Sequence, residues 1–484
     1  MDKKARYITT TIPYVNASPH IGFALEVVQA DALARFWRLM GHDVFFNTGA
    51  DEHGQKIWEK AQEGGEDTQA YVDRYAEELA QLKETLNLSN DNFIRTTNPE
   101  HKKAAQELWK RCEETGDIYK KKYKGLYCVG CEKFLTERDL ENGKCPLHPS
   151  KEPVELEEEN YFFRLSKYQK ELLEYLSRKD VIIPPHRLQE AKLFVEADLE
   201  DASISREREK LPWGVPVPGD ESQVMYVWFD ALTNYISTLG WPNDADGNYK
   251  KFWEDGETLQ VAGKDMIRFQ SILWQAMLIS AGLANTDKIF YHGFINSGGQ
   301  RMSKSLGNVI SPFEMVEKYG TDATRYMLLR HVHPVDDSDV TWEKMDEWYT
   351  AHLVNGLGNL TARVMKLCED NLEEPINEPG KLGDEDVARD MEDFSFNGAI
   401  DVVFALGSAL DERITKEEPY KIVKEDLEQG REILKACASE LWNIGRLLEP
   451  FMPETSEKIL RAVKENKKPE NLFPRLTETS QDES

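Results

Sequence analysis

The first fifty residues alternate between strand and helix patterns, and this alternation is the strongest constraint on the fold. Residues 7–11 form an apolar, β-branched run that ends before Pro13, and residues 25–40 carry apolar side chains at helical spacing. A second strand pattern follows at residues 43–48. This order predicts a parallel sheet flanked by helices, which binds ligands at the carboxyl ends of its strands.

The strand pattern is interrupted and later resumes. Residues 117–222 contain a cysteine cluster and a basic stretch, and we interpret them as an insertion. Strand patterns return at 224–228, 258–262 and 289–291, so the insertion divides one nucleotide-type fold into two halves.

After residue 342 the strand patterns disappear. Apolar side chains then recur at alternating steps of four and three, which predicts a helical bundle, at Leu353, Leu357, Leu360, Val364 and Leu367. Residues 464–484 are polar and carry two prolines, so we expect them to be peripheral or frayed.

Charge and cysteine content limit the functional class and the compartment. The 484 residues include 60 Lys plus Arg and 87 Asp plus Glu, a formal net charge of −27. This charge excludes broad adhesion to nucleic acid or anionic membranes, so a polyanionic partner must bind at a local basic patch. No apolar run reaches the ~18 residues of a membrane span, and the six cysteines are too few for a disulfide scaffold. We therefore expect a cytoplasmic protein.

The turn after the first strand pattern is suited to phosphate groups. Ser18 is a favourable N-cap and Pro19 fits the first helical position, so His20 is predicted in the first helical turn. The N–H groups at a helix start bind anions, and Gly22 lets a phosphate approach the backbone. The alternative is a histidine that caps an ordinary surface helix.

A basic loop far downstream strengthens the phosphate interpretation. Arg301 and Lys304 lie between glycines and can place positive charge over a phosphate chain, although an isolated basic loop is usually a solvated surface. Together, the Pro-His-Ile-Gly turn and the Arg-Met-Ser-Lys-Ser loop resemble the HIGH and KMSKS motifs of class I aminoacyl-tRNA synthetases.

Three further segments narrow the resemblance to the methionyl-tRNA synthetase family. They are Ala-Asp-Glu-His-Gly at residues 50–54, Tyr-Val-Trp-Phe-Asp-Ala at 226–231 and Gly-Lys-Asp at 263–265. The resemblance implies a methionine–tRNA ligase that makes methionyl-adenylate from L-methionine and ATP with Mg²⁺. The methionyl group then passes to the terminal ribose of initiator and elongator methionine tRNA.

The resemblance also implies an α/β architecture: a Rossmann-like parallel-sheet catalytic domain, split by a zinc-binding connective insertion and followed by an α-helical anticodon-binding bundle. The implied parts are the first catalytic half (1–116), the insertion (117–222), the second catalytic half (223–295), the loop and linking segment (296–345), the anticodon-binding domain (346–465) and a tail (466–484). Because the chain ends soon after the bundle, we expect no appended tRNA-binding barrel and a monomer.

Site residues are implied position by position. Those expected to contact methionine are Ile12, Pro13, Tyr14, Asp51 at the ammonium group, Trp228, Ala231, Leu232, Tyr235, Phe269, Gln270 and Trp274. Those expected to contact ATP are His20, Gly22, Glu26, Gly263, Asp265, Lys304, Val309 and Ile310, with His20, Arg301 and Lys304 catalytic. Those expected to contact the anticodon are Asn359, Arg363, Pro419 and Tyr420. Without the resemblance, the aromatic residues of this set, such as Trp228, Tyr235 and Trp274, would more commonly be ordinary core residues.

Four positions depart from the family pattern. Phe23 replaces a second histidine, which puts the rate of adenylate formation in doubt, and Arg301 replaces a lysine. Gln270 replaces a histidine but still donates and accepts hydrogen bonds, so altered tuning of the pocket is expected. Tyr420 replaces a tryptophan and keeps an aromatic face for stacking.

The cysteine cluster predicts a structural zinc site on its own. Cys128 and Cys131 are separated by thirteen residues from Cys145, which is followed by His148. Three thiolates and one imidazole form a closed tetrahedral set, so the expected role is structural rather than catalytic. The alternative is a lost site with unligated thiols.

Rival functions remain open at this point. Synthetases for valine, isoleucine and leucine share the two motifs, but they carry a large editing domain that the insertion has little room for. A cysteine-activating relative would more naturally place zinc in its amino-acid site. A non-catalytic tRNA-binding paralogue is favoured only by Phe23.

Overall fold

The computed structural model describes residues 4–128, 133–135, 139–146, 152–197, 199–302, 307–376 and 385–476 of the chain. The chain divides into two compact units. Unit 1 comprises Met1–Pro19, Gly41–Gln81 and Asn90–His292, and unit 2 comprises His20–Met40, Leu82–Ser89 and Gly293–Ser484.

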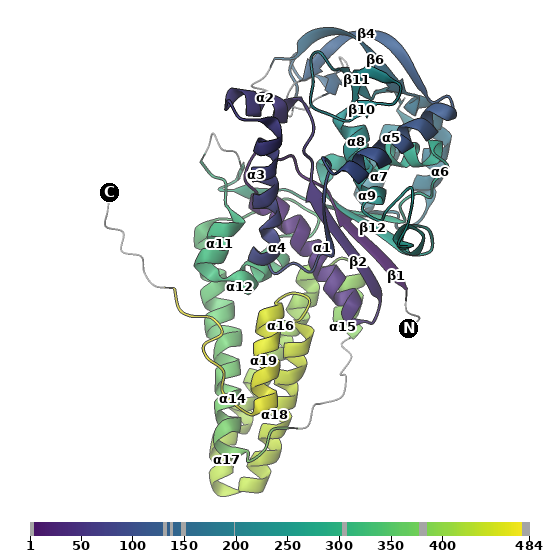
Figure 1. Cartoon of the computed structure of the whole chain (residues 1–484). Helices are drawn as coiled ribbons and strands as arrows, with labels where there is room; N and C mark the ends of the chain where they lie inside the picture. Colours follow the sequence, from purple (N-terminus) through teal and green to yellow (C-terminus); the bar gives the residue numbers. More distant parts are fainter. Residues whose placement is uncertain are drawn as a thin grey trace, which may run out of the picture. The chain divides into compact units, whose positions relative to one another are not determined.

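Unit 1 contains a six-stranded parallel sheet (Figure 1). Its strands, in spatial order, are β3 (Asn92–Arg95), β2 (Asp43–Ala50), β1 (Ala5–Thr10), β12 (Glu257–Gly263), β13 (Lys288–His292) and β7 (Ile182–Ile183). Tyr7 of β1 lies opposite Phe45 on one side and Thr258 on the other. Because β1 and β12 are neighbours, the two halves of the predicted fold form one sheet, which confirms the predicted fold class.

Helices in unit 1 pack an aromatic core around this sheet. The helices are α2 (Gln55–Glu63), α3 (Thr68–Ala80), α5 (Pro99–Glu114), α6 (Gln169–Ser177), α7 (Pro185–Glu196), α8 (Val227–Leu232), α9 (Asn234–Ser237) and α10 (Trp274–Ser280). Unit 1 also contains the 3₁₀ helices η2 (Leu165–Tyr168) and η4 (Lys264–Met266) and the π-helical turns η3 (Lys250–Glu254) and η5 (Phe269–Leu273). The ring centroids of Trp109 and Phe229 are 5.2 Å apart, and both side chains are fully buried. Buried rings of this size dominate core energetics.

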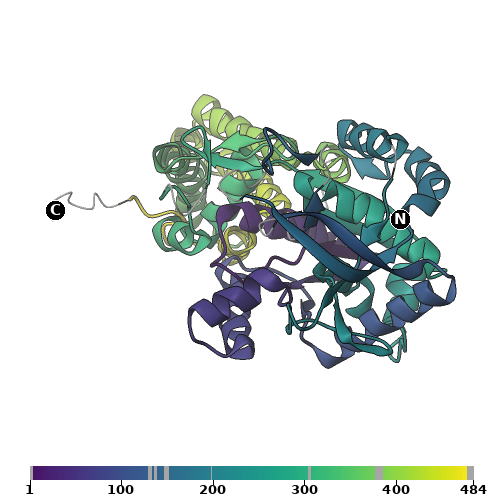
Figure 2. The same cartoon turned by 90° about the horizontal axis from the view of Figure 1, so that it is seen from above.

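Two antiparallel sheets complete unit 1. The strands β4 (Ile118–Cys128) and β6 (Val154–Phe163) form a long ribbon, visible in Figures 1 and 2. The strands β5 (Lys133–Leu135) and β8 (Ala202–Ser203) extend this ribbon into a four-stranded sheet. The other sheet has the order β10 (Pro216–Val217), β11 (Asp220–Met225) and β9 (Ser205–Glu207).

The prediction that residues 224–228 resume the parallel sheet is wrong. Met225 ends β11, which pairs with β9 and β10, and helix α8 already begins at Val227. The last strand residues and the first helical turn are both buried. A short apolar run cannot distinguish these two buried conformations.

Unit 2 is mainly helical, as predicted. Its helices are α1 (Ile21–Leu39), α4 (Leu82–Thr85), α11 (Pro312–Tyr319), α12 (Thr321–Tyr326), η7 (Met327–His331), α13 (Trp342–Trp348), η8 (Tyr349–Gly358), α14 (Asn359–Asn371), α15 (Glu385–Glu392), α16 (Phe396–Glu417), α17 (Pro419–Glu425), α18 (Leu427–Leu447) and α19 (Pro453–Glu465). Three short strands, β14 (Ile295–Ser297), β15 (Gln300–Arg301) and β16 (Ser338–Asp339), form a small sheet. The helices α14, α16, α18 and α19 run side by side in Figure 1. Leu353, Leu360 and Val364 are buried, which confirms the predicted apolar seam.

A buried ion pair ties α1 to the rest of unit 2. Asp31 and Arg325 are both fully buried, with Arg325 Nη2 2.7 Å from Asp31 Oδ2. Arg325 also donates hydrogen bonds to the carbonyls of Leu86, Pro450 and Phe451. Burial alone would raise the pKa of Asp31, but the charges of Arg325 and Arg35 and hydrogen bonds from Ser89 lower it.

The C-terminal stretch is better anchored than its composition indicates. Phe473 is buried against the ring of Tyr349, and the Tyr349 hydroxyl donates to the Pro474 carbonyl at 2.8 Å. Residues 464–476 are mostly exposed, which fits the expected peripheral position, although Phe473 and Pro474 anchor them; residues 477–484 lie outside the described part. Within the described ranges, no helix combines the length and apolar character needed to cross a membrane.

Candidate functional site

The start of α1 differs from the prediction in which residue caps it. The helix begins at Ile21, and His20, not Ser18, is the N-cap. Its Nδ1 accepts a hydrogen bond from the Gly22 N–H at 3.0 Å, so the imidazole supplies the acceptor that a serine hydroxyl usually supplies. A Cβ atom on Gly22 would lie 2.7 Å from this ring, so the glycine also makes room for the cap.

Residues of the predicted phosphate site gather in unit 2 near this helix start. The Ile21 N–H donates to the Ile310 carbonyl at 3.1 Å, which places residues 309–310 beside His20. Desolvation by surrounding protein and the positive charge of Arg301 lower the pKa of His20, although its ring remains accessible to solvent. The neutral ring keeps Nδ1 as an acceptor. Lys304 lies outside the described residues.

The remaining residues predicted to bind ATP are divided between the two units. Glu26 lies in α1 and is buried. Gly263 ends β12 in unit 1, and a Cβ atom there would lie 2.7 Å from Asp265 Oδ1. Glycine at this position therefore allows the exposed Asp265 carboxylate to lie against the end of a strand, where parallel sheets bind ligands.

The residues predicted to bind methionine are brought together in unit 1. Asp51 follows β2 and is 2% exposed, and its N–H donates to the Pro13 carbonyl at 2.9 Å. Tyr14 meets Trp228 edge-on with centroids 6.1 Å apart, and Trp228 stacks on Phe269 at 3.8 Å. A carboxylate and three aromatic rings thus share one region, and Ile12 precedes Pro13 at its border. We call these residues, with the second group below, the amino-acid cluster.

A second group in the amino-acid cluster is fully buried. Gln270 Nε2 donates to the Tyr235 hydroxyl at 2.8 Å, and the ring of Tyr235 meets that of Trp274 edge-on at 5.7 Å. Ala231 and Leu232 are also buried. The backbone that carries Gln270 and Trp274 is an irregular helix, in which the π-helical turn η5 leads into α10. The hydrogen bond to Tyr235 shows that the glutamine at position 270 serves as a donor, as expected.

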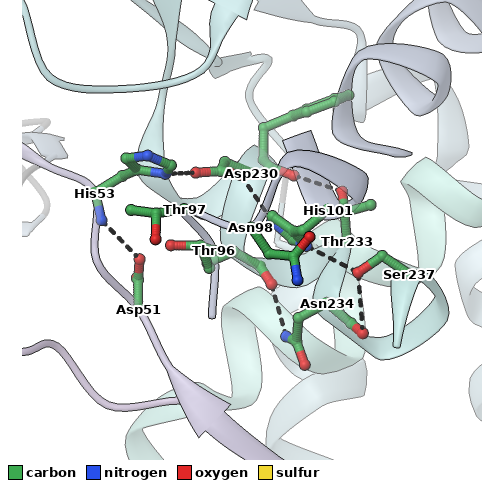
Figure 3. Close-up of polar contacts among 12 residues, drawn as sticks. Asp51, His53, Thr96, Thr97, Asn98, His101, Asp230, Thr233, Asn234 and Ser237 are labelled. Carbon is green, nitrogen blue, oxygen red and sulfur yellow. Dashed lines mark hydrogen bonds and ion pairs between the residues drawn. The ribbon is translucent and has the colours of Figure 1, made fainter. Parts of the chain in front are cut away.

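Sequence reasoning missed a buried polar network next to the amino-acid cluster (Figure 3). Asp230 Oδ2 lies 2.6 Å from His53 Nδ1, and Asp230 Oδ1 lies 2.9 Å from His101 Nε2. Burial alone would raise the pKa of Asp230, but the charge of His53 and hydrogen bonds from both imidazoles hold it well below its usual range. The sequence held one indication of this network: His53 and Asp230 both lie inside segments that carry the family resemblance.

The bundle of unit 2 contains a hollow of about 340 Å³. Asn359 and Arg363, one turn apart on α14, line it together with Asp411 of α16. Arg363 forms an ion pair with Asp411. Tyr420, next to Pro419 at the start of α17, is 41% exposed. The Tyr420 hydroxyl donates a hydrogen bond to Glu418 Oε1 at 2.9 Å, and this bond raises the pKa of Tyr420.

Two of the four predicted zinc ligands lie in the described part of the chain. Cys128 and Cys145 are both 1% exposed and belong to one small cluster with Leu135. Cys131 and His148 lie outside the described residues. Two buried thiols brought together from positions 128 and 145 fit the donor set of a structural zinc site.

Comparisons with known proteins agree with this geometry. Residues 6–153 and 139–365 match the family described as tRNA synthetases class I (M). A methionine–tRNA ligase of Brucella suis biovar 1 (strain 1330) is 40% identical over 477 residues, covering 95% of this chain and 92% of the relative. A methionine–tRNA ligase of Thermotoga maritima is 39% identical over 483 residues, covering 96% of this chain and 76% of the relative.

A solved structure shows the same similarity. The methionyl-tRNA synthetase of Mycobacterium tuberculosis in complex with methionyl-adenylate superposes with a TM-score of 0.88 at 34% identity, covering 98% of this chain and 99% of that one. With the parallel sheet, the helical C-terminal region and relatives about 40% identical over at least 95% of this chain, the chain belongs to the class I tRNA synthetases (M).

Proposed function

We propose that the chain is a methionine–tRNA ligase. It forms methionyl-adenylate and pyrophosphate from L-methionine and ATP, and it then transfers the methionyl group to the terminal ribose of methionine tRNA, initiator and elongator. The observation that carries this proposal is the amino-acid cluster, in which buried Asp51 accompanies the rings of Tyr14, Trp228 and Phe269. The carboxylate suits an ammonium group and the rings suit a thioether, since sulfur–aromatic contacts contribute about 0.3–1.5 kcal/mol each.

The amino-acid cluster binds and orients methionine. Asp51 accepts hydrogen bonds from the ammonium group, and the rings contact the side chain. The full set of residues assigned to methionine is Ile12, Pro13, Tyr14, Asp51, Trp228, Ala231, Leu232, Tyr235, Phe269, Gln270 and Trp274. The donor Gln270 fixes the Tyr235 hydroxyl, which defines the polar end of an otherwise apolar surface.

The nucleotide step relies on positioning and electrostatics. The methionine carboxylate attacks the α-phosphorus, and pyrophosphate leaves; no covalent enzyme intermediate is required. The positive charges of Arg301 and Lys304 and the capped helix start at His20 stabilise the triphosphate. The residues assigned to ATP are His20, Gly22, Glu26, Gly263, Asp265, Lys304, Val309 and Ile310. Mg²⁺ that accompanies ATP would supply charge neutralisation on the phosphates.

The hollow in the bundle is the proposed anticodon site. Asn359 and Arg363 supply hydrogen-bonding groups for base edges, and Tyr420 beside Pro419 supplies an exposed ring for stacking. Stacking on such a ring contributes about 1–3 kcal/mol per base. The proposed domain boundaries follow the expected ones, with residues 346–465 as the anticodon-binding domain.

We assign one structural Zn²⁺ to Cys128, Cys131, Cys145 and His148. The metal stabilises the insertion and takes no part in catalysis, because four protein ligands leave no open position. The buried pair Cys128 and Cys145 supports this assignment. Metal analysis is expected to give about one zinc per chain, and zinc-free protein of unchanged stability would refute the site.

The chain is further proposed to act as a cytoplasmic monomer. Six cysteines in 484 residues fit a reducing compartment. The large apolar side chains exposed in the described part of the chain belong to four elements, β6, α7, α17 and α18, as Val154, Leu193, Tyr420 and Leu427. Sedimentation analysis tests the monomer.

Amino-acid-dependent ATP–pyrophosphate exchange on the purified chain, run separately with all the standard amino acids, tests the function. Exchange with methionine alone is expected, and Lys304→Ala should reduce it by orders of magnitude while the protein stays folded. Exchange with valine, isoleucine or leucine would reassign the substrate. No exchange from protein that still binds tRNA would favour a non-catalytic paralogue.

A further inference from the structure

We propose that His53, Asp230 and His101 form a positioning network that holds Asp51 and Trp228 in place and thereby sets the affinity for methionine. This inference rests on the proposed function. None of the three side chains is assigned to a substrate, yet all are at most 2% exposed and lie beside the amino-acid cluster (Figure 3). Buried ionisable groups of this kind need a complete set of partners.

Both oxygens of Asp230 are engaged by imidazoles. Oδ2 lies 2.6 Å from His53 Nδ1 and Oδ1 lies 2.9 Å from His101 Nε2. His101 is fixed in turn by Ser237 Oγ, 2.8 Å from its Nδ1. Two charge-assisted hydrogen bonds hold this buried carboxylate in one orientation. They also make it sensitive to substitution of either histidine, because loss of one donor leaves a buried charge only partly compensated.

His53 connects this carboxylate to Asp51. Its ring contacts Asp230, while its backbone N–H lies 3.3 Å from Asp51 Oδ1 and so helps to orient that carboxylate. The residue between them is fixed as well: Glu52 Oε1 lies 2.5 Å from Arg95 Nε, and the Glu52 carbonyl accepts from Trp213 Nε1 at 2.6 Å. These contacts hold the turn that carries Asp51, and the His53 side chain links this turn to Asp230.

Asp230 itself connects the network to the aromatic residues. It lies in α8, a six-residue helix without a side-chain cap, between Trp228 and Ala231. His101 lies in the first turn of α5 and Ser237 ends α9. Asp230 of α8 thus links the turn after β2 to α5 and, through His101, to α9. Rotation of α8 would displace the Trp228 ring, which stacks on Phe269.

Paired substitutions test whether the donors position the amino-acid cluster or only stabilise the fold. His53→Leu and His101→Leu remove a donor, whereas His53→Asn and His101→Gln place an amide N–H where Nδ1 or Nε2 was. Asp230→Asn removes the charge. The matched control is Asp117→Asn, since Asp117 is an equally buried carboxylate that accepts from Ser280 and Lys167 and contacts no residue assigned to methionine.

The readouts are the KM values for methionine and for ATP in pyrophosphate exchange, methionine affinity by calorimetry, and the melting temperature. The leucine variants and Asp230→Asn should raise the methionine KM by about tenfold or more and change the ATP KM less than about twofold, because small misplacement of binding groups is costly. His53→Asn and His101→Gln should keep the methionine KM close to that of the unmodified chain. Asp117→Asn should lower only the melting temperature.

Two results would overturn the inference. An unchanged methionine KM with a lowered melting temperature would make the network purely structural, and equal increases in both KM values would remove its specificity for the amino acid. If the unmodified chain shows neither methionine binding nor methionine-dependent exchange, the proposed function fails instead, and the inference fails with it.

Discussion

The amino-acid cluster of unit 1 and the hollow in the bundle of unit 2 present their polar groups in different ways. In the cluster, Asp51 is 2% exposed and Gln270 is fully buried, and both already have hydrogen-bond partners within unit 1. In the bundle, Tyr420 is 41% exposed and Arg363 is engaged by the carboxylate of Asp411.

This difference fits the two proposed ligands. A small zwitterion is bound well by groups that need not rearrange, because preorganisation reduces the entropy cost of binding. A large polyanion can pull surface side chains away from their internal partners, since such surface ion pairs are worth only about 0–1 kcal/mol. A chain with net charge −27 can therefore carry acidic residues in its proposed tRNA site without blocking it.

Among changes in these two regions, the largest expected effect comes from removing the charge of Asp51. Asp51→Asn should lower kcat/KM for methionine in pyrophosphate exchange by about 10- to 100-fold, because hydrogen bonds to charged groups contribute about 1.5–3 kcal/mol. Binding of tRNA in a filter assay should not change. A parallel loss of tRNA affinity would mean that the two regions are not functionally separate.

Removal of the Arg363 side chain should impair the reaction with tRNA and leave methionine activation intact. Arg363→Ala is expected to reduce kcat/KM for tRNA in aminoacylation by roughly tenfold, since a good base contact contributes about 1–3 kcal/mol. Exchange without tRNA should be unaffected. Arg413→Ala is the matched control, because Arg413 is also ion-paired on the bundle but does not line the hollow. Equal losses in the two variants would contradict the assignment.

The two units should also respond differently to pH. Burial, then the charges of Arg330 and His352, lower the pKa of His331 to about 3, so the folded state resists a proton that the unfolded state accepts below the ordinary value of 6.5. Stability of unit 2 should therefore fall by about 1 kcal/mol between about pH 7.5 and about pH 5, after allowance for solvent screening.

Hydrogen exchange in η7 and η8 at several pH values measures this effect. His331→Gln should flatten the dependence, and an unchanged slope in that variant would exclude His331 as its source. Asp230 behaves differently: its lowered pKa gives stability that is fully present above the ordinary aspartate value of 3.8 and is lost only as the pH falls further.

The smallest effect is expected for the carboxylate that holds Arg363. Asp411→Asn should raise tRNA affinity up to about fivefold, because an exposed ion pair is worth at most about 1 kcal/mol and a negative charge leaves the hollow. Titration at two salt concentrations should show the gain mainly at low salt. A loss of affinity would mean that Asp411 itself contacts the tRNA.

Much of the fold followed from local sequence patterns, whereas the supporting contacts did not. The strand at 258–262 and the bundle seam through Leu360 depend on short-range periodicity, and the structure confirms them. The contact between His53 and Asp230 spans 177 residues, and periodicity cannot predict which polar residues meet at that separation. The cap of α1 was misassigned because an imidazole acceptor replaced the expected serine hydroxyl.

The pair Asp31 and Arg325 has a mechanical consequence. Arg325 contacts both Asp31 of α1 and the carbonyls of Pro450 and Phe451, which lie between α18 and α19, so one buried side chain links α1 to the bundle. A displacement of the bundle by the proposed tRNA partner would act through this link on α1, whose capped end is about 16 Å from Asp31 along the helix. By thermodynamic reciprocity, any change this causes in nucleotide affinity equals the change that the nucleotide causes in tRNA affinity.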